Sequence, residues 1–340
     1  MLMAFGRVAS GSLNRRAGCA ALLALLAFPR LPSAQVRGRK ARVGLLIEPA
    51  LDSGMQKAVI EPLRQGLQRF GYLEGQNLVL EVRSADGKFE RLPGLADELL
   101  RLDPDVLITA FPAATLAAQK ATGTVPIVAA SVEDPVVMGL AATLARPGGN
   151  ITGVSGFGQE VVAKRLQLVR EFVPTVQRIG LLTNPNAGPF NNLDVVIGKW
   201  ERTLDVQIRV YEARGPDDFE GAFAAMARDQ VGGLVVFADN NTYTHRVRLN
   251  DLCLQRRMPS VWGGRDFLTG GGLASYQADF PSMFTRAAAL THKILQGQKP
   301  ADIPFEQATK LELVIDKRAA KALGIAVSKA RLVTADWVIE

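Results

Sequence analysis

The chain has 340 residues, 48% of them hydrophobic, with 40 basic against 33 acidic side chains and a net charge of +7. This length exceeds what one hydrophobic core usually holds and favours two domains, and the composition excludes disordered, collagen-like and disulfide-rich proteins. Four basic residues and no acid fall within the first 34 positions, so the rest has 36 basic against 33 acidic residues, or +3. No basic run remains that indicates a nucleic-acid-binding face, and we expect no nucleic-acid partner.

The N-terminus predicts a secretory signal peptide over residues 1–34. An arginine pair precedes an apolar run, 20–28, that is too short to cross a bilayer, and a pair of small residues follows, ending at Ala34. A surface-covering helix would need a polar face, which the run lacks. We therefore expect export by the general secretion route and a periplasmic protein. Cys253 is then the only cysteine after the leader, which excludes an internal disulfide and suits a buried helical position.

From residue 42 onward, short apolar runs of strand type alternate with segments of helical periodicity. In the first series, strands are expected at 42–47, 77–83, 105–110 and 125–131, and helices at 55–70, 92–102, 113–121 and 136–144. In the second, strands are expected at 178–183, 206–212, 232–238 and 259–262, and helices at 161–172, 217–228 and 244–256. Beyond residue 270 follow one more strand and loop, a helix at 281–296, and a strand with a short helix within 311–325.

This alternation predicts parallel sheets covered by helices on both faces, and its repetition predicts an α/β protein with two doubly wound, Rossmann-like lobes and a central ligand cleft. The stretch LARPGGNITG at 144–153 separates the two series. It follows a helix, whereas a dinucleotide or Walker loop follows a strand, so we interpret it as a connection with hinge residues Asn150, Gly153 and Ser155. The expected lobes comprise residues 42–153 plus about 274–303, and residues 154–273 plus about 304–340.

Open parallel sheets bind ligands beyond the carboxyl ends of their strands. Helices that begin at 113 and near 136 would direct N–H groups at an anionic group, and Asp134 could receive an ammonium. Arg265 could clamp a carboxylate, and aromatic rings could stack on an apolar side chain. Glu48 and Asp239 could instead be solvated or could cap helices. The candidate ligand-binding residues are Glu48, Phe111, Pro112, Ala113, Ala114, Ser131, Asp134, Asn184, Asn186, Asp239, Trp262, Arg265 and Tyr276.

Several stretches together resemble the tryptophan/tyrosine-type substrate-binding proteins of bacterial ABC importers. These are FGYLEGQNLVLEVRSADG, EDPVVMGL, LARPGGNITG and TNPN, in one order from about residue 42 to the C-terminus. The resemblance implies a type I periplasmic binding protein fold that binds a small solute reversibly and delivers it to an ABC permease in the inner membrane. Asp134-Pro135, Pro112-Ala113-Ala114 and Asn184-Pro185 match the family's motifs. Ala110-Phe111 stand where Gly-Thr is more usual, and the match ends after Asn186.

We therefore expect a monomeric solute receptor for an amino acid, aromatic or branched, which is not an enzyme. Two alternatives stay open. A two-lobed enzyme, such as a nucleotide-sugar-dependent transferase, would place Glu48 or Asp134 as acid or base, and the sensory lobe of a repressor would need an N-terminal helix-turn-helix. Neither histidine has a companion at metal-binding spacing, so we expect no metal and no cofactor.

Overall fold

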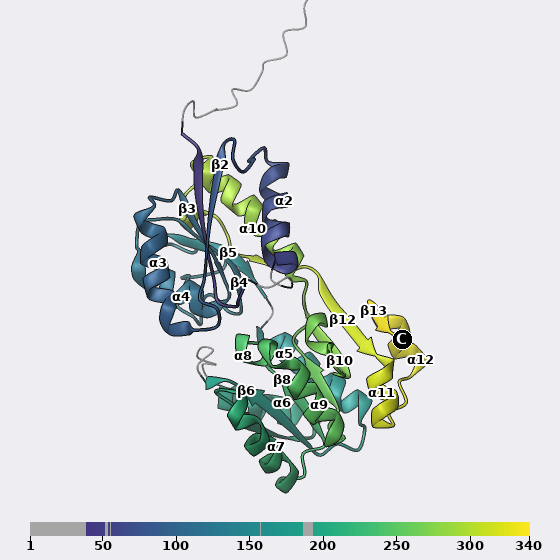
Figure 1. Cartoon of the computed structure of the whole chain (residues 1–340). Coiled ribbons are helices and arrows are strands. Elements are labelled where there is room, and N and C mark those ends of the chain that lie inside the picture. The colour runs from purple at the N-terminus through teal and green to yellow at the C-terminus, as the bar shows by residue number, and fades with distance from the viewer. Residues whose placement is uncertain (1–38, 52–53, 55, 157, 186–192) are drawn as a thin grey trace, which may run out of the picture. The chain divides into compact units, whose positions relative to one another are not determined.

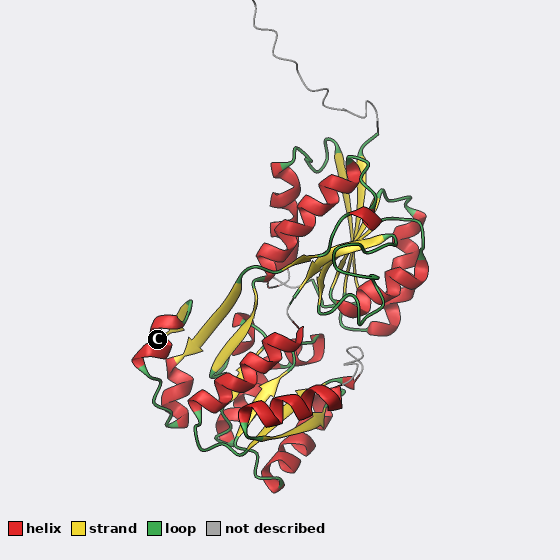
Figure 2. Ribbon diagram, turned by 180° about the vertical axis from the view of Figure 1, so that it is seen from behind, coloured by secondary structure: helices red, strands yellow, loops and turns green. Residues whose placement is uncertain are grey.

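The computed structural model describes residues 39–340 except 52–53, 55, 157 and 186–192. The expected signal peptide at 1–34 and the candidate Asn186 therefore lie outside the described residues. Figure 1 shows two groups of strands flanked by helices, and Figure 2 shows from behind that extended segments connect them. Within the described part of the chain, no helix is long and apolar enough to cross a membrane.

The first sheet has six parallel strands in the order β11-β5-β4-β3-β1-β2. Its strands are β1 (Ala41–Ile47), β2 (Leu78–Ser84), β3 (Val106–Ala110), β4 (Ile127–Val132), β5 (Ile151–Ser155) and β11 (Glu306–Gln307). Its helices are α2 (Glu61–Arg69), α3 (Leu92–Arg101), α4 (Pro112–Ala121) and α10 (Phe280–Leu295), with a π-helical turn η1 (Gln56–Ile60) before α2. Both faces are covered, because Leu45 packs in one core with residues of α2 and α10, and the next residue, Leu46, packs with residues of α3 and α4.

The second sheet has seven strands in the order β13-β12-β10-β9-β8-β6-β7, parallel except for the antiparallel pair β10 and β12. Its strands are β6 (Arg178–Thr183), β7 (Gln207–Glu212), β8 (Gly233–Val236), β9 (Ser260–Trp262), β10 (Ala274–Ala278), β12 (Leu311–Asp316) and β13 (Trp337–Ile339). Its helices are α5 (Gly158–Phe172), α6 (Leu193–Leu204), α7 (Phe219–Arg228), α8 (Asn240–Thr244), α9 (Arg246–Gln255), α11 (Lys317–Leu323) and α12 (Lys329–Thr334). Leu181 packs with α5 and α6, and Leu182 packs with α7 and α9, where Cys253 is also buried as expected.

The chain passes between the sheets three times, after β5, between β10 and α10, and between β11 and β12. The third passage is tied to the first where the N–H of Ala308 donates to the Ser155 carbonyl at 2.8 Å. It is tied to the second where the N–H of Asp279 donates to the Lys310 carbonyl at 3.0 Å, and Lys310 Nζ lies 3.0 Å from Asp279 Oδ2. These three segments therefore form a narrow, cross-linked bridge.

The passages fall at positions that differ from the expected boundaries. Strand β10 pairs with β9 and β12 in the second sheet, so the chain returns to the first sheet after Ala278 rather than at about 274. Residues 306–307 pair with β5 of the first sheet, although we expected 304–340 in the second lobe. The edge pairing of β11 with β5 joins segments about 150 residues apart in the sequence, and hydrophobic periodicity does not record such a pairing.

Two expected helices differ from the structure, and one helix was not expected. Residues 136–144 form turns and no helix, because Asp134 Oδ1 accepts the N–H groups of residues 136 and 137 and Gly139 has a left-handed φ of 70°. Helix α6 was missed, because it contains a glycine and Trp200 is its only buried residue, so its apolar period is weak. The expected helix 244–256 is divided at His245 into α8 and α9.

Candidate functional site

A cavity of about 860 Å³ lies among loops that follow the carboxyl ends of strands in both sheets. Glu48 follows β1 and Phe111 follows β3 in the first sheet, while Asn184 follows β6 and Asp239 follows β8 in the second. This is where open parallel sheets place their ligands. The volume suits a small organic solute.

Most of the expected ligand residues line this cavity, but four do not. Those that line it are Glu48, Phe111, Pro112, Ser131, Asp134, Asn184, Asp239 and Arg265. Trp262 is fully buried in β9, where its Nε1 donates to Ser260 Oγ at 2.8 Å, so it is a core residue. Tyr276 packs against the core of the second lobe. Ala113 and Ala114 are not among the lining residues, and another group of the protein accepts the Ala114 N–H at the start of their helix.

That group is the carboxylate of Glu48, which is only 5% exposed and is not solvated. Its Oε1 accepts the N–H of Ala114 at 3.0 Å, at the N-terminus of α4, where the ligand's anionic group was expected. Burial raises the pKa of Glu48 to about 8, against the opposing effect of the Ala114 and Ala113 N–H groups, and the charge of Asp239 raises it further. Glu48 is therefore mostly protonated at neutral pH and brings a titratable group to the cavity.

Asp239 caps α8 and faces the same cavity from the second sheet. Its Oδ1 accepts the Thr242 N–H at 2.6 Å, and the Asp239 N–H donates to Thr242 Oγ1 at 2.9 Å, so that the two residues form a capping box. Its Oδ2 is buried and has no hydrogen-bond partner among the described residues. Burial raises the pKa of Asp239, although hydrogen bonding to this carboxyl from Thr242, from the Asn184 side chain and from the Asn241 N–H lowers it. A buried acceptor without a donor is costly, which indicates that a ligand group belongs there.

Arg165 was missed by the sequence analysis and is the most buried cation of the cavity, at 6% exposure. It lies on α5 between core residues, and its Nε donates to the Tyr276 carbonyl at 2.7 Å. Desolvation lowers its pKa to about 10, while Glu133 opposes this change. The Glu133 side chain is solvent-accessible. Desolvation of its carboxyl by neighbouring protein atoms raises its pKa, and the positive charge of Arg165 opposes this change. The sequence does contain a signal for this residue, because Arg165 falls within the apolar face of a helix. Arginine is rarely buried unless it has a charged partner, so such a position indicates a partner nearby.

Arg265 is already engaged within the protein. Its guanidinium lies 2.6 Å from Glu312 Oε2 and over the ring of Trp337, 4.3 Å from the ring centroid. This ion pair and ring contact compete with the expected role of Arg265 as a carboxylate clamp. Arg165 is better suited to that role, because among the described residues its guanidinium donates only through Nε, to the Tyr276 carbonyl.

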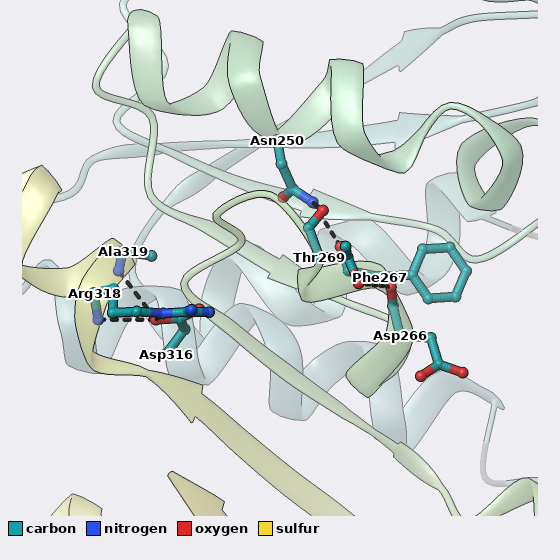
Figure 3. Close-up of polar contacts among 7 residues, drawn as sticks. All are labelled: Asn250, Asp266, Phe267, Thr269, Asp316, Arg318 and Ala319. Atoms are coloured by element: carbon teal, nitrogen blue, oxygen red, sulfur yellow. Dashed lines mark hydrogen bonds and ion pairs between the residues drawn. The ribbon is translucent and has the colours of Figure 1, made fainter. Parts of the chain in front are cut away.

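A buried asparagine fixes the loop that carries Arg265 by hydrogen bonds to its backbone. Figure 3 shows Asn250 of α9 reaching the segment 265–269, where Nδ2 donates to the carbonyls of Phe267 at 2.6 Å and Thr269 at 3.2 Å. In the same view Asp316 accepts from Arg318 and Ala319 at the start of α11. Asn250 therefore positions one wall of the cavity, with Asp266 and Phe267 among its lining residues.

Phe111 is the strained residue of the site. Its backbone has φ 76° and ψ 164°, a conformation that is almost confined to glycine and costs about 1–3 kcal/mol. Its ring meets that of Phe280 edge to face, with centroids 5.5 Å apart, and both residues line the cavity. The strain is the structural cost of presenting an aromatic surface at the end of β3.

The three expected hinge residues lie in or next to β5. Asn150 Nδ2 donates to the Val125 carbonyl at 2.8 Å, and Ser155 ends the strand at the first passage between sheets. Gly153 lies so close to β4 that a Cβ added there would overlap the carbonyl of Ala129. Hinge movement at these positions stays a prediction.

Comparison with known proteins agrees with this geometry. A family model described as ABC transporter substrate binding protein matches residues 47–339. The chain is 23% identical over 292 residues to a tyrosine-binding protein of Clostridioides difficile, covering 82% of this chain and 79% of the relative.

Two solved structures are similar over the whole of their length. A conserved domain protein from Vibrio cholerae aligns with a TM-score of 0.81 and 26% identity, covering 88% of this chain and 100% of that one. An ABC domain in complex with L-Trp from Streptococcus pneumoniae aligns with a TM-score of 0.78 and 22% identity, with the same coverage. These likenesses, with the two-sheet topology, confirm the expected fold of a type I periplasmic binding protein.

Proposed function

Because the chain belongs to the ABC transporter substrate binding protein family, we propose that it binds a free amino acid in its cavity and delivers it to a membrane permease. The preferred ligand is aromatic or branched. The ligand leaves chemically unchanged, so the protein acts as a receptor and not as an enzyme. Its place of action is the periplasm, reached through the signal peptide expected at 1–34.

One observation carries this proposal: a buried guanidinium, a buried carboxyl and a half-buried carboxyl face one cavity whose remaining lining includes aromatic rings. Arg165 is suited to a carboxylate, Glu48 and Asp239 to an ammonium, and Phe111 to an apolar side chain. An amino acid carries all three groups. The relatives' tyrosine and L-Trp support this ligand class for the present chain.

The proposal is tested by titrating the twenty amino acids into the purified protein by isothermal calorimetry. We expect saturable binding of at least one aromatic or branched amino acid, and nuclear magnetic resonance of the recovered ligand should show no chemical change. Cell fractionation should place the protein in the periplasm. Absence of heat with every amino acid would refute the proposed ligand class.

Arg165→Met tests the carboxylate contact. Loss of one partner of a buried, charge-assisted contact costs roughly 2–5 kcal/mol, so we expect the Kd to rise at least about thirtyfold. Lys164→Met is the matched control, because Lys164 precedes Arg165 on α5 and does not line the cavity. Equal affinity of both variants would exclude Arg165 from the site.

A further inference from the structure

We propose that Glu48 and Asp239 together hold the ammonium group of the ligand, and that ligand binding releases a proton from Glu48 to solvent. This inference rests on the proposed function, because it assigns a charge state and a role to two side chains of the same cavity. It replaces Asp134 as the expected ammonium partner.

The two carboxyls reach the cavity from different sheets. Glu48 follows β1 and Asp239 follows β8, and both are lining residues. They are near enough for the charge of Asp239 to raise the pKa of Glu48. A ligand group held between them would therefore contact both lobes at once.

The hydrogen bonds of the two carboxyls leave acceptors for an ammonium. The Ala114 N–H uses Glu48 Oε1, and Thr242 uses Asp239 Oδ1. Buried Asp239 Oδ2 has no partner among the described residues. An ammonium brings three donors and no acceptor, so it is matched to these oxygens.

The cationic side chains around the cavity do not neutralise the negative charge that Glu48 and Asp239 can carry. Lys57 from η1, Arg165 from α5, Arg246 from α9 and Arg265 from the segment after β9 line the cavity, as do the acids Glu133, Asp134, Glu160, Asp266, Asp279 and Glu312. In the described part of the chain none of these cations forms an ion pair with Glu48 or Asp239. Asp86, beside the Gly87 N–H that donates to the Glu48 carbonyl, is paired with Arg91. The pair therefore lacks a positive partner that an ammonium would supply.

Asp134 is less suited to this role. Its Oδ1 accepts the N–H groups of Val136 and Val137, both at 3.0 Å, and its side chain is exposed. It holds the turn that replaces the expected helix. An exposed carboxylate gains little from an ammonium in water.

The release of a proton on binding follows from the environment of Glu48. Without ligand, burial raises the pKa of Glu48 to about 8, so the group is mostly neutral at pH 7. An adjacent ammonium favours the charged form and lowers this pKa. A neutral carboxylic acid and an ammonium thus become a carboxylate–ammonium pair plus one proton in solvent, with no other bond changed. Affinity consequently rises with pH below pH 8, by about tenfold per unit, while the amine of the free ligand stays protonated.

The experiment is calorimetric titration of L-tryptophan, L-tyrosine and L-leucine at pH 7 in phosphate and in Tris, whose ionisation enthalpies differ. We expect release of about one proton per ligand at pH 7 for whichever amino acid binds, falling to about half a proton at pH 8, where free Glu48 is half ionised and the ligand amine is still protonated. Glu48→Gln should bind without proton release and with a flat pH profile. Glu90→Gln, the control at an exposed carboxyl that does not line the cavity, should keep the proton release of the wild type.

A ligand without the ammonium supplies the second arm. Indole-3-propionate, which lacks the amino group of L-tryptophan, should bind at least tenfold more weakly and release no proton. Proton-neutral binding of the amino acid by the wild type, or equal affinity for indole-3-propionate, would overturn the inference and leave the proposed receptor function standing. Absence of binding by every amino acid would overturn both.

Discussion

At the residue scale, several side chains of the site lie in energetically unfavourable environments. Glu48 is buried with a raised pKa, Asp239 has an unpartnered oxygen, Arg165 is a buried cation and Phe111 has a strained backbone. Each lines the same cavity. Such concentration is typical of binding sites, where ligand contacts offset costs that the empty protein bears.

Glu48→Gln should therefore stabilise the ligand-free protein in a pH-dependent way. The folded state holds the Glu48 proton more tightly than the unfolded chain, because burial raises the pKa from 4.5 to about 8. Stability is then lost as pH rises between these two values. Gln can still accept the Ala114 N–H, and it has no proton to lose. The free energy of unfolding of the variant should therefore exceed that of the wild type by at most about 5 kcal/mol at pH 8.

Thermal unfolding without ligand between pH 5 and pH 8 measures this effect. The gap in Tm between Glu48→Gln and the wild type should widen with pH and shrink toward pH 5. Asp134→Asn, at an exposed carboxyl, should show no such trend. Parallel curves for Glu48→Gln and the wild type would mean that Glu48 is ionised in the folded state throughout.

At the element scale, the passage from β5 to α5 depends on close packing of β5 against β4. Gly153 in β5 leaves no room for a Cβ beside the Ala129 carbonyl, and the pairing of these two strands shifts register just beyond this point. The irregularity lies at the end of the strand that first leaves the sheet. Glycine is thus required here by close approach of two backbones.

Gly153→Ala should destabilise the protein by about 2–4 kcal/mol, because strands β4 and β5 must separate to admit the methyl group. Gly94→Ala is the matched control, since Gly94 lies in α3 with open space around it and the change raises helix propensity by about 0.5–1 kcal/mol. Urea unfolding of both variants gives the comparison. Equal stabilities would show that the β4–β5 contact is not tight in solution.

At the scale of the whole molecule, three passages connect the two sheets and are tied to one another by the Ala308–Ser155 and Asp279–Lys310 contacts. A ligand held by Glu48 from the first sheet and by Asp239 and Arg165 from the second would bias any movement about this bridge toward the liganded state. Hinge closure of this kind changes the dimensions of the molecule without changing its secondary structure.

Small-angle X-ray scattering should therefore show a smaller radius of gyration when the amino acid that binds in calorimetry is present at saturation. With ligand at about ten times the wild-type Kd, Arg165→Met should show a much smaller change, because a roughly thirtyfold higher Kd leaves most of its cavities empty. An unchanged radius in saturated wild-type protein would refute closure, although not binding.

The sequence by itself determined the alternation of strands and helices, the two sheets and the loops that would surround a ligand. These follow from local hydrophobic periodicity and from the rule that parallel strands present their carboxyl ends at one edge. It thus placed eight expected residues at the cavity, among them Glu48, Asp134 and Asp239.

Only the tertiary structure decided which side chains at those positions face the ligand and in what charge state. Trp262 is buried in the core, and Arg265 forms an ion pair with Glu312. Glu48 accepts the hydrogen bond at the helix N-terminus where the anionic group of the ligand was expected. Arg165 entered from the middle of a helix, where no strand-end rule applies. Burial and pairing arise between segments far apart in the chain, so periodicity, which is a local property, carries no record of them.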